Sequence, residues 1–225
     1  MPRPRFFRLP DDKRRRILET AALELAARGF RGASLNRIIS TAGISKGAAY
    51  YYFDDKADLF AAVMRHGWQA LAPPRPFDLG ALTRKTFWTD LEAAYRGLLA
   101  RVQQAPWLTA IGKLAYGPLP STEATDVMAA EFARARGWLR AIVERGQALG
   151  TIRRDVPADL LMATVAGAFE AADRWMVEAS TSMSHDEMDR LALVLFAMMR
   201  QVVAPPGAAR LRAAPRRAVR TRRRR

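Results

Sequence analysis

Residues 34–56 read SLNRIISTAGISKGAAYYYFDDK, and the pattern of this stretch predicts the fold of the region around it. Ser34 can cap a short helix, and Gly43 permits the left-handed backbone with which a chain leaves a helix sharply. Ser45 can cap a second short helix that runs to Tyr52. A two-turn helix, a glycine turn and another short helix have the spacing of a helix-turn-helix.

The second short helix starts with small or basic residues and ends in Tyr50, Tyr51 and Tyr52. Small residues allow a helix to approach a surface closely. Three consecutive side chains on a helix cannot all face one core, so at least one tyrosine must point outward. A phenol there can donate to a phosphate oxygen or touch a base edge. We expect Tyr52 and Phe53 to face mainly inward and Tyr50 to share an outward face with Lys46.

Helical patterns extend over most of the remaining chain and predict an all-α fold of about nine helices. Four segments are expected: a flexible basic arm at 1–10, a helix-turn-helix DNA-binding domain with a connecting helix at 11–71, a second helical domain at 78–203, and a disordered Arg-rich tail at 204–225. Outside the short pair, helices are predicted at about 11–29, 56–71, 83–104, 107–116, 121–150, 157–179 and 184–205.

Basic charge is concentrated at the two ends of the 225-residue chain, whose formal net charge is +15. Residues 1–64 carry a net charge of +5, residues 65–203 of +1 and residues 204–225 of +9. This distribution indicates that the ends contact a polyanion. The tail alone can be read as a solvated end, but non-specific attraction to DNA is the interpretation we favour.

Several classes of protein and site are not supported by the sequence. The chain has no cysteine, and His66 and His185 are its only histidines, so no metal site is expected. It has no nucleotide-binding glycine loop and no Gly-x-Ser-x-Gly elbow, so neither a cofactor nor an enzymatic activity is predicted. No apolar run reaches the roughly 18 residues of a membrane span, and no signal core follows the N-terminus, so we expect a cytoplasmic, nucleoid-associated protein without membrane contact.

A larger set of residues between positions 14 and 64 carries a family resemblance. The set comprises Ile17-Leu18, Ala21-Ala22, Gly29-Phe30, Ser34-Leu35, Ile38, Ala42 to Gly47, Tyr50 to Phe53, Lys56 and Leu59. These residues resemble the DNA-binding domain of TetR-family regulators. Three departures are Ile39 in place of a small alanine, and Ala48 and Ala49 in place of a commoner Thr-Leu pair.

The resemblance implies a role for individual residues at the DNA surface. Ser34, Tyr51 and Lys56 would contact phosphates, whereas Lys46, Gly47 and Tyr50 would approach bases. The full predicted DNA-binding set is Ser34, Ser45, Lys46, Gly47, Tyr50, Tyr51 and Lys56. Because Ala48 lacks the hydroxyl of the usual threonine, base specificity is not carried over.

The resemblance also implies a homodimer built on the last two helices. The helix at 184–205 is apolar nearly all round, and the helix before it is rich in small residues that permit close approach. Predicted interface residues are Ala163, Gly167, Leu191, Leu195, Met198 and Val202. A fully internal core is the alternative reading of the same pattern.

The second domain is expected to bind a small-molecule effector. Its candidate lining residues are Tyr95, Trp107, Tyr116, Trp138, Met162, Phe169 and Trp175. Each of these taken alone is more often an ordinary core residue than a ligand contact. Glu170 and Asp173 lie near them in sequence and could receive a cationic ligand, although a solvated or ion-paired carboxylate is the plainer reading.

These features predict a transcriptional repressor that is released from a palindromic operator by a small apolar or amphipathic ligand. The helix at 56–71 joins the two domains and would relay the change. A ligand-independent DNA binder or an activator of the same fold is one alternative. A helical enzyme or a lipid-binding module with a basic surface is another.

Overall fold

The computed structural model describes residues 2–45, 49–72, 77–117, 119–120, 122–179 and 182–206, apart from the side chains of Ala49 and Glu123. In these ranges the chain forms nine α-helices and one short 3-10 helix, with no strand. The elements are η1 (Phe6–Arg8), α1 (Asp11–Gly32), α2 (Leu35–Thr41), α3 (Ala49–Tyr52), α4 (Lys56–Leu71), α5 (Phe87–Gln104), α6 (Pro106–Ala115), α7 (Thr122–Ala148), α8 (Ala158–Ala179) and α9 (His185–Val203). The all-α prediction is confirmed.

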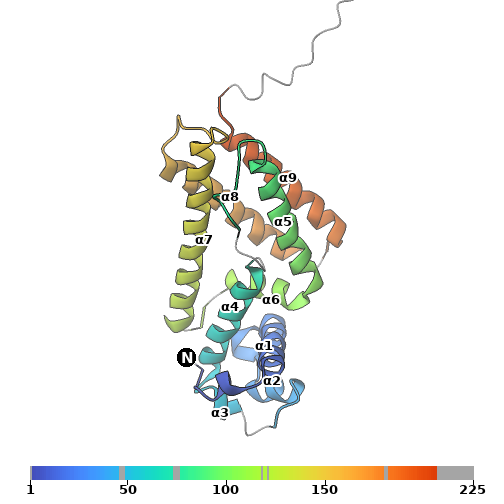
Figure 1. Cartoon of the computed structure of the whole chain (residues 1–225). Coiled ribbons are helices and arrows are strands. Elements are labelled where there is room, and N and C mark those ends of the chain that lie inside the picture. Colours follow the sequence, from blue (N-terminus) through green and yellow to red (C-terminus); the bar gives the residue numbers. More distant parts are fainter. Residues whose placement is uncertain are drawn as a thin grey trace, which may run out of the picture.

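One core lies among α1, α2 and α4 at one end of the molecule (Figure 1). Ile17, Leu25, Ile38 and Phe60 are at most 1% exposed in it. The same core continues into the next helices, because Ile111 of α6 is also part of it. Helices α1 to α4 therefore share a packed core with the later helices, in addition to their covalent connection through the chain.

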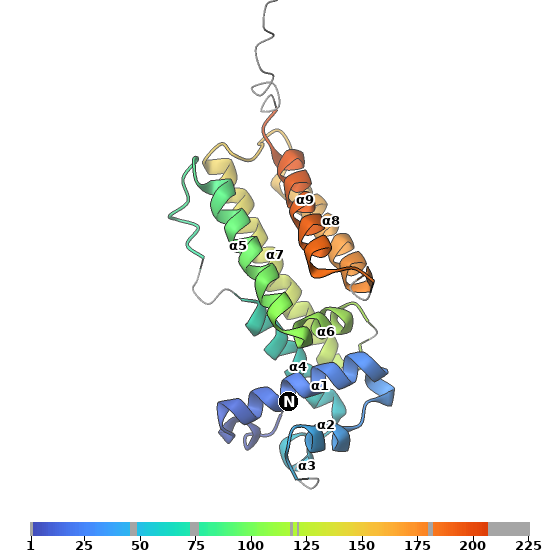
Figure 2. The ribbon, with the colours of Figure 1, turned by 90° about the vertical axis from the view of Figure 1, so that its right-hand side faces the viewer.

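A second core lies toward the other end, where α5, α7, α8 and α9 run along one another (Figure 2). Its most buried members include Phe87, Val143, Ile152 and Leu161. Within this group α7 packs against α8, α8 against α9, and α5 against α9, so that α5 and α7 lie on opposite sides in Figure 1. One side of α8 and α9 carries exposed apolar side chains, among them Trp175 and Val194.

Helix ends follow the signals in the sequence. Ser184 and Glu187 form the predicted capping box at the start of α9, in which the Ser184 side chain accepts from the Glu187 backbone N–H. The bounds of α4 agree with the predicted range 56–71. At the end of α1 the backbone departs from helical geometry at Gly29, where φ is 67°, but the assigned helix continues to Gly32.

The N-terminal segment differs from its prediction. It contains the 3-10 turn η1, and Phe6 within it is only 1% exposed. In the described part, residues 2–10, the segment packs against the first core, whereas its composition predicts a flexible arm. The physical reason is that one apolar side chain docks into the first core, and neighbouring backbone hydrogen bonds then hold the segment. The predicted tail lies outside the described residues from position 207 onward.

Candidate nucleic-acid interface

Polar caps hold the helix-turn-helix in shape. The Ser34 hydroxyl accepts a hydrogen bond from the Arg37 backbone N–H at 3.4 Å, which starts α2. Gly43 has a φ of 73°, the left-handed conformation expected for the turn that leaves α2. After α3, the Asp55 carboxylate accepts from the Asp58 backbone N–H at 2.8 Å and starts α4. The short α3 is thus held between two capped helices.

The tyrosines divide between the inside and the outside of the molecule as predicted. Phe53 is fully buried and Tyr52 is half-buried, whereas Tyr50 is 61% and Tyr51 is 46% exposed. Ser45, just before α3, is exposed as well. Because the exposed phenols lie on a helix with a rigid base beneath it, they form a hydrogen-bonding surface at one tip of the molecule (Figure 1). Lys46 and Gly47, the other predicted contacts on this helix, lie outside the described residues.

The Lys56 side chain forms hydrogen bonds within the protein. Its Nζ donates to the Arg31 carbonyl at 3.2 Å and to the Ala33 carbonyl at 3.0 Å, and it lies 4.7 Å from the ring centroid of Phe30. These contacts join the start of α4 to the end of α1. An ammonium group has three donors, so two carbonyls occupy only part of its capacity.

Three of the predicted ligand-binding residues gather near the second core. The Tyr95 ring centroid lies 6.2 Å from that of Phe169 and 5.6 Å from that of Phe196, with which it stacks. Tyr116 lies near the same end of α8, beside the Asp173 carboxyl group. This group combines aromatic surface with nearby acidic side chains, Asp173 above all.

The other predicted ligand-binding residues are dispersed. Trp107 stacks on His66 with ring centroids 4.9 Å apart, on the α4 side of the first core. Met162 is a buried core residue. Trp138 on α7 and Trp175 on α8 are 48% and 52% exposed. The structure therefore does not bring the seven residues together around a single cavity, because their helices present them in different directions.

Burial controls the ionisation of the Asp173 cluster. Although Asp173 is exposed as a whole residue, desolvation of its carboxyl group raises the pKa to about 6, and the Tyr116 hydrogen bond opposes that rise. Desolvation likewise raises the pKa of Tyr95 and of Tyr116 above the usual range, with the nearby Asp173 carboxylate adding to the effect. Arg174 lies 5.2 Å from the Tyr116 ring centroid. The cluster therefore holds a carboxyl group whose surroundings disfavour its charged form.

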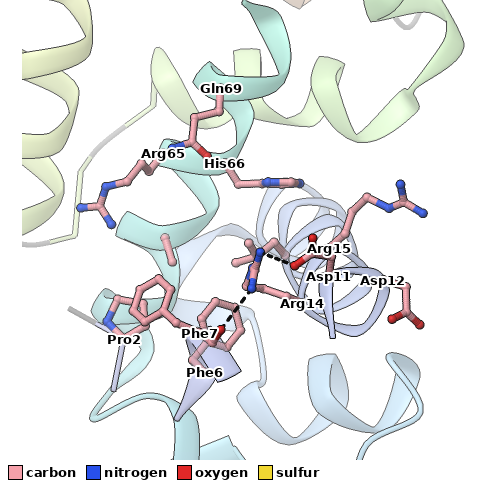
Figure 3. A pocket seen from close by; sticks show the side chains of 12 residues that line it. Pro2, Phe6, Phe7, Asp11, Asp12, Arg14, Arg15, Arg65, His66 and Gln69 are labelled. Atoms are coloured by element: carbon pink, nitrogen blue, oxygen red, sulfur yellow. Dashed lines mark hydrogen bonds and ion pairs between the residues drawn. The ribbon is translucent and has the colours of Figure 1, made fainter. Parts of the chain in front are cut away.

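A groove of about 390 Å³ lies where the N-terminal segment, α1 and α4 meet (Figure 3). Its lining carries both signs of charge, with Asp11, Asp12, Arg14, Arg15 and Arg65 among the residues. Arg14 donates to the Asp11 carboxylate at 2.7 Å, so part of this charge is neutralised internally. Beside the groove, desolvation and the charges of Arg15 and Arg14 lower the pKa of His66.

An uncovered apolar face runs along α8 and α9. Its large members are Leu160 and Trp175 on α8 and Leu191, Val194, Met198 and Val202 on α9, which are between 39% and 59% exposed. Ala163 and Gly167, two predicted interface residues, are exposed on α8, whereas Leu195 is half-buried. A Cβ atom added at Gly167 would meet nothing within 4 Å inside the chain.

The described residues were compared with the requirements of a membrane-spanning helix and of a metal site. None of the helices described has the length and apolarity that a membrane crossing requires. Over the same residues, histidine, aspartate and glutamate side chains do not gather in any group of three or more that could hold a metal ion.

Sequence comparison finds matches among regulators. Residues 17–63 match the family model for bacterial regulatory proteins of the tetR family. The HTH-type transcriptional repressor AcnR of Corynebacterium diphtheriae is 28% identical over 159 residues, which span 66% of this chain and 73% of that protein. These matches agree with the prediction of a regulator that is not an enzyme.

Comparison of structures extends the likeness to most of the chain. A TetR family transcriptional regulator from Chloroflexus aurantiacus superposes with a TM-score of 0.55 at 25% identity, covering 90% of this chain and 93% of that one. The regulator FadR from Bacillus subtilis, solved in complex with stearoyl-CoA, has a TM-score of 0.66 at 15% identity and covers 84% of this chain and 98% of that one. The second likeness concerns the fold alone.

Proposed function

We propose that this chain is a transcriptional repressor of the TetR family of bacterial regulatory proteins that binds a palindromic DNA operator as a homodimer. One observation carries the proposal: Tyr50 and Tyr51 are exposed on a short helix that two capped helices hold in place. A repressor of this kind acts at the nucleoid. The name of the AcnR relative supports repression as the direction of regulation.

The proposed DNA contacts divide into two groups. Lys46, Gly47 and Tyr50 approach base edges in the major groove, which admits a helix. Ser34, Ser45, Tyr51 and Lys56 bind or orient toward phosphates. Lys56 has two roles. Its hydrogen bonds to the carbonyls at the end of α1 fix its position, and from there its remaining N–H donor can reach a phosphate.

The proposed dimer forms through the uncovered face of α8 and α9. Leu191, Met198 and Val202 supply its apolar surface, Leu195 borders it, and Ala163 and Gly167 allow the partner's helix to approach closely. The open space at Gly167 supports this, since nothing inside the chain requires a glycine at that helical position. A two-fold axis through this face presents two copies of α3, as a palindromic operator needs.

The proposed effector is a small apolar or amphipathic molecule that binds beside the second core. The cluster of Tyr95, Phe169 and Asp173 supports a ligand with an aromatic or aliphatic body and a polar or cationic group. The fold likeness to FadR, solved with stearoyl-CoA, fits an amphipathic ligand.

The proposed relay is α4, which packs against α1, α6 and α7. Its contact with α6 is close, because a Cβ added at Gly67 would lie only 2.6–2.9 Å from Ile111 side-chain atoms. A shift of α6 on ligand binding would therefore move α4 and the α3 helix before it. The ligand changes operator affinity only by its differential affinity for the two arrangements.

The central test measures operator binding of Lys46→Ala in the full-length chain. The probe is a DNA duplex that the wild-type protein selects from a randomised 30-base-pair library, and band-shift titration measures affinity. Lys46→Ala is expected to lower affinity roughly tenfold or more, because each good base contact contributes about 1–3 kcal/mol. Arg84→Ala removes the same charge at an exposed position next to α5 and should leave affinity unchanged. If wild-type protein selects no sequence, or if Lys46→Ala binds like wild type, the assignment of the recognition helix is wrong.

Two other functions predict different outcomes. An activator of the same fold would lower expression from a reporter carrying the selected sequence when its own gene is deleted, whereas a repressor would raise it. A helical enzyme or lipid-binding module with a basic surface would lose all DNA affinity when residues 206–225 are deleted. The proposed repressor keeps sequence-specific binding without them.

A further inference from the structure

The N-terminal segment, residues 2–9, is bound to the corner between α3 and α4. The Arg3 backbone N–H donates to the Tyr52 carbonyl at 2.8 Å, at the last residue of α3. The Arg3 Nε also donates to the Asp54 carboxylate at 2.7 Å. One residue thus anchors the segment by its backbone and by its side chain to the helix-turn-helix.

An apolar anchor and a basic clamp hold the rest of this segment. Phe6 is 1% exposed, and its ring centroid lies 4.8 Å from that of Phe53 and 6.2 Å from that of Tyr52. On the other side, the Arg14 guanidinium of α1 donates to the Phe7 carbonyl at 3.3 Å and to the Leu9 carbonyl at 3.5 Å (Figure 3 shows the first). The segment is therefore attached to α1 and to the end of α3 at once.

Arg5 lies between these attachments and points to the exposed face. Its guanidinium carbon lies 4.4 Å from the ring centroid of Tyr51, which is 46% exposed. Arg5 is exposed, and among the described residues it has no carboxylate partner, whereas Arg3 is paired with Asp54. The two arginines therefore differ: the charge of Arg3 is neutralised within the protein and that of Arg5 is available to a ligand.

We propose that residues 2–9 form a fixed extension of the DNA-binding surface and that Arg5 contacts a phosphate of the DNA backbone beside Tyr51. This inference rests on the proposed function. A guanidinium presents a planar fork of donors that suits phosphate oxygens, and stacking on a tyrosine ring limits its orientations before DNA arrives. Phe6 acts as the positioning residue, because it determines where Arg5 emerges.

The test is the salt dependence of operator affinity for Arg5→Ala, in the full-length chain with the duplex selected by wild type. Each phosphate contact adds about 0.9 to the slope of log affinity against log salt concentration. A dimer that loses two such contacts should show a slope lower by about 1.8 and an affinity lower by roughly tenfold. Arg5→Lys keeps the charge and should recover most of the slope.

Two controls separate this contact from other causes. Arg84→Ala removes an exposed charge away from the segment and should leave both slope and affinity unchanged. Circular dichroism should show that Arg5→Ala melts like wild type. A slope and affinity for Arg5→Ala equal to those of wild type would overturn the inference while leaving the proposed function intact. Failure of wild type itself to select a sequence would instead overturn the proposed function.

Discussion

Large apolar side chains are buried in the first core and exposed on the α8–α9 face. In the first core, Phe6, Phe53 and Phe60 are at most 1% exposed within one chain. On the α8–α9 face, Trp175 and Met198 are more than half exposed. A region that buries its aromatic residues alone can fold as a unit, whereas a region that leaves a contiguous apolar face in water is suited to a partner. The first core is therefore enclosed within one chain, whereas the α8–α9 face leaves large apolar side chains exposed.

The two cores also suit the two different roles proposed for them, DNA recognition and ligand response. A dense core lies beside α3, on which Tyr50 and Tyr51 are exposed, and this arrangement suits the proposed DNA contacts. The second core is bordered by half-buried aromatic residues and by the Asp173 carboxyl group, which offer an environment that can respond to a ligand. The surface proposed to bind DNA and the cluster proposed to bind the effector therefore lie beside different cores.

The largest expected effect comes from removing an aromatic ring from the first core. Phe60→Ala should lower the free energy of unfolding by about 3–5 kcal/mol, because the ring is 1% exposed and packs edge-on against Phe30 at 6.0 Å. Trp138→Ala, at a half-exposed position in the other half of the chain, should cost about 1 kcal/mol or less. Denaturant unfolding followed by circular dichroism measures both. Equal losses would show that the first core is not the more tightly packed region.

A charge placed on the α8–α9 face should have the next largest effect. Val194 is 54% exposed, and Val194→Asp would place a carboxylate where the proposed partner packs. Sedimentation velocity should show a monomer, and operator affinity should fall on the order of a hundredfold because the two half-sites are no longer bound together. Ala133→Asp, on the exposed side of α7, is the matched control and should remain dimeric. A dimeric Val194→Asp variant would place the interface elsewhere.

The smallest expected effect is a pair of opposite pH dependences. Burial lowers the pKa of His66 below its usual 6.5, so the unfolded chain binds this proton more tightly and stability falls as the pH drops below about 6.5. Asp173 behaves in reverse: its pKa is raised from 3.8 to about 6, so its stabilising contribution is complete below pH 3.8 and is lost as the pH rises through 6.

Melting temperatures of two variants should separate these contributions. His66→Gln should reduce the loss of stability between pH 7 and pH 5, whereas Asp173→Asn should raise the melting temperature at pH 7 and leave it unchanged near pH 4. Each shift should be no more than a few degrees, since both groups are partly exposed. A variant of His66 that keeps the full acid sensitivity of wild type would contradict the assignment.

Local patterns anticipated most helices and part of the site. The glycine turn after α2, the capping box of α9 and the bounds of α4 depend on residues a few positions apart, which interact in any context. The division of the tyrosines followed from the rotation of a helix alone. These features were predictable because the interactions that produce them are local.

Contacts between distant residues were not predictable in this way. The bond of Arg3 to Asp54 joins positions 51 residues apart. No local pattern in the segment PRPRFFRLP indicates that Phe6 is buried in the first core. The prolines and arginines of this segment are typical of a mobile arm, and the segment alone does not show that one of its two phenylalanines is a core residue. The candidate ligand residues were chosen as aromatic, and only packing could show that Trp107 faces His66 while Trp175 faces solvent.

Periodicity, caps and turn residues in the sequence alone therefore determined an all-helical chain with a helix-turn-helix near its start. Tertiary structure alone decided which apolar side chains are enclosed, where the N-terminal segment attaches and which face of α8 and α9 stays open. The physical reason is range: a cap or a turn is satisfied by neighbours in the chain, whereas burial depends on every surface that folding brings together.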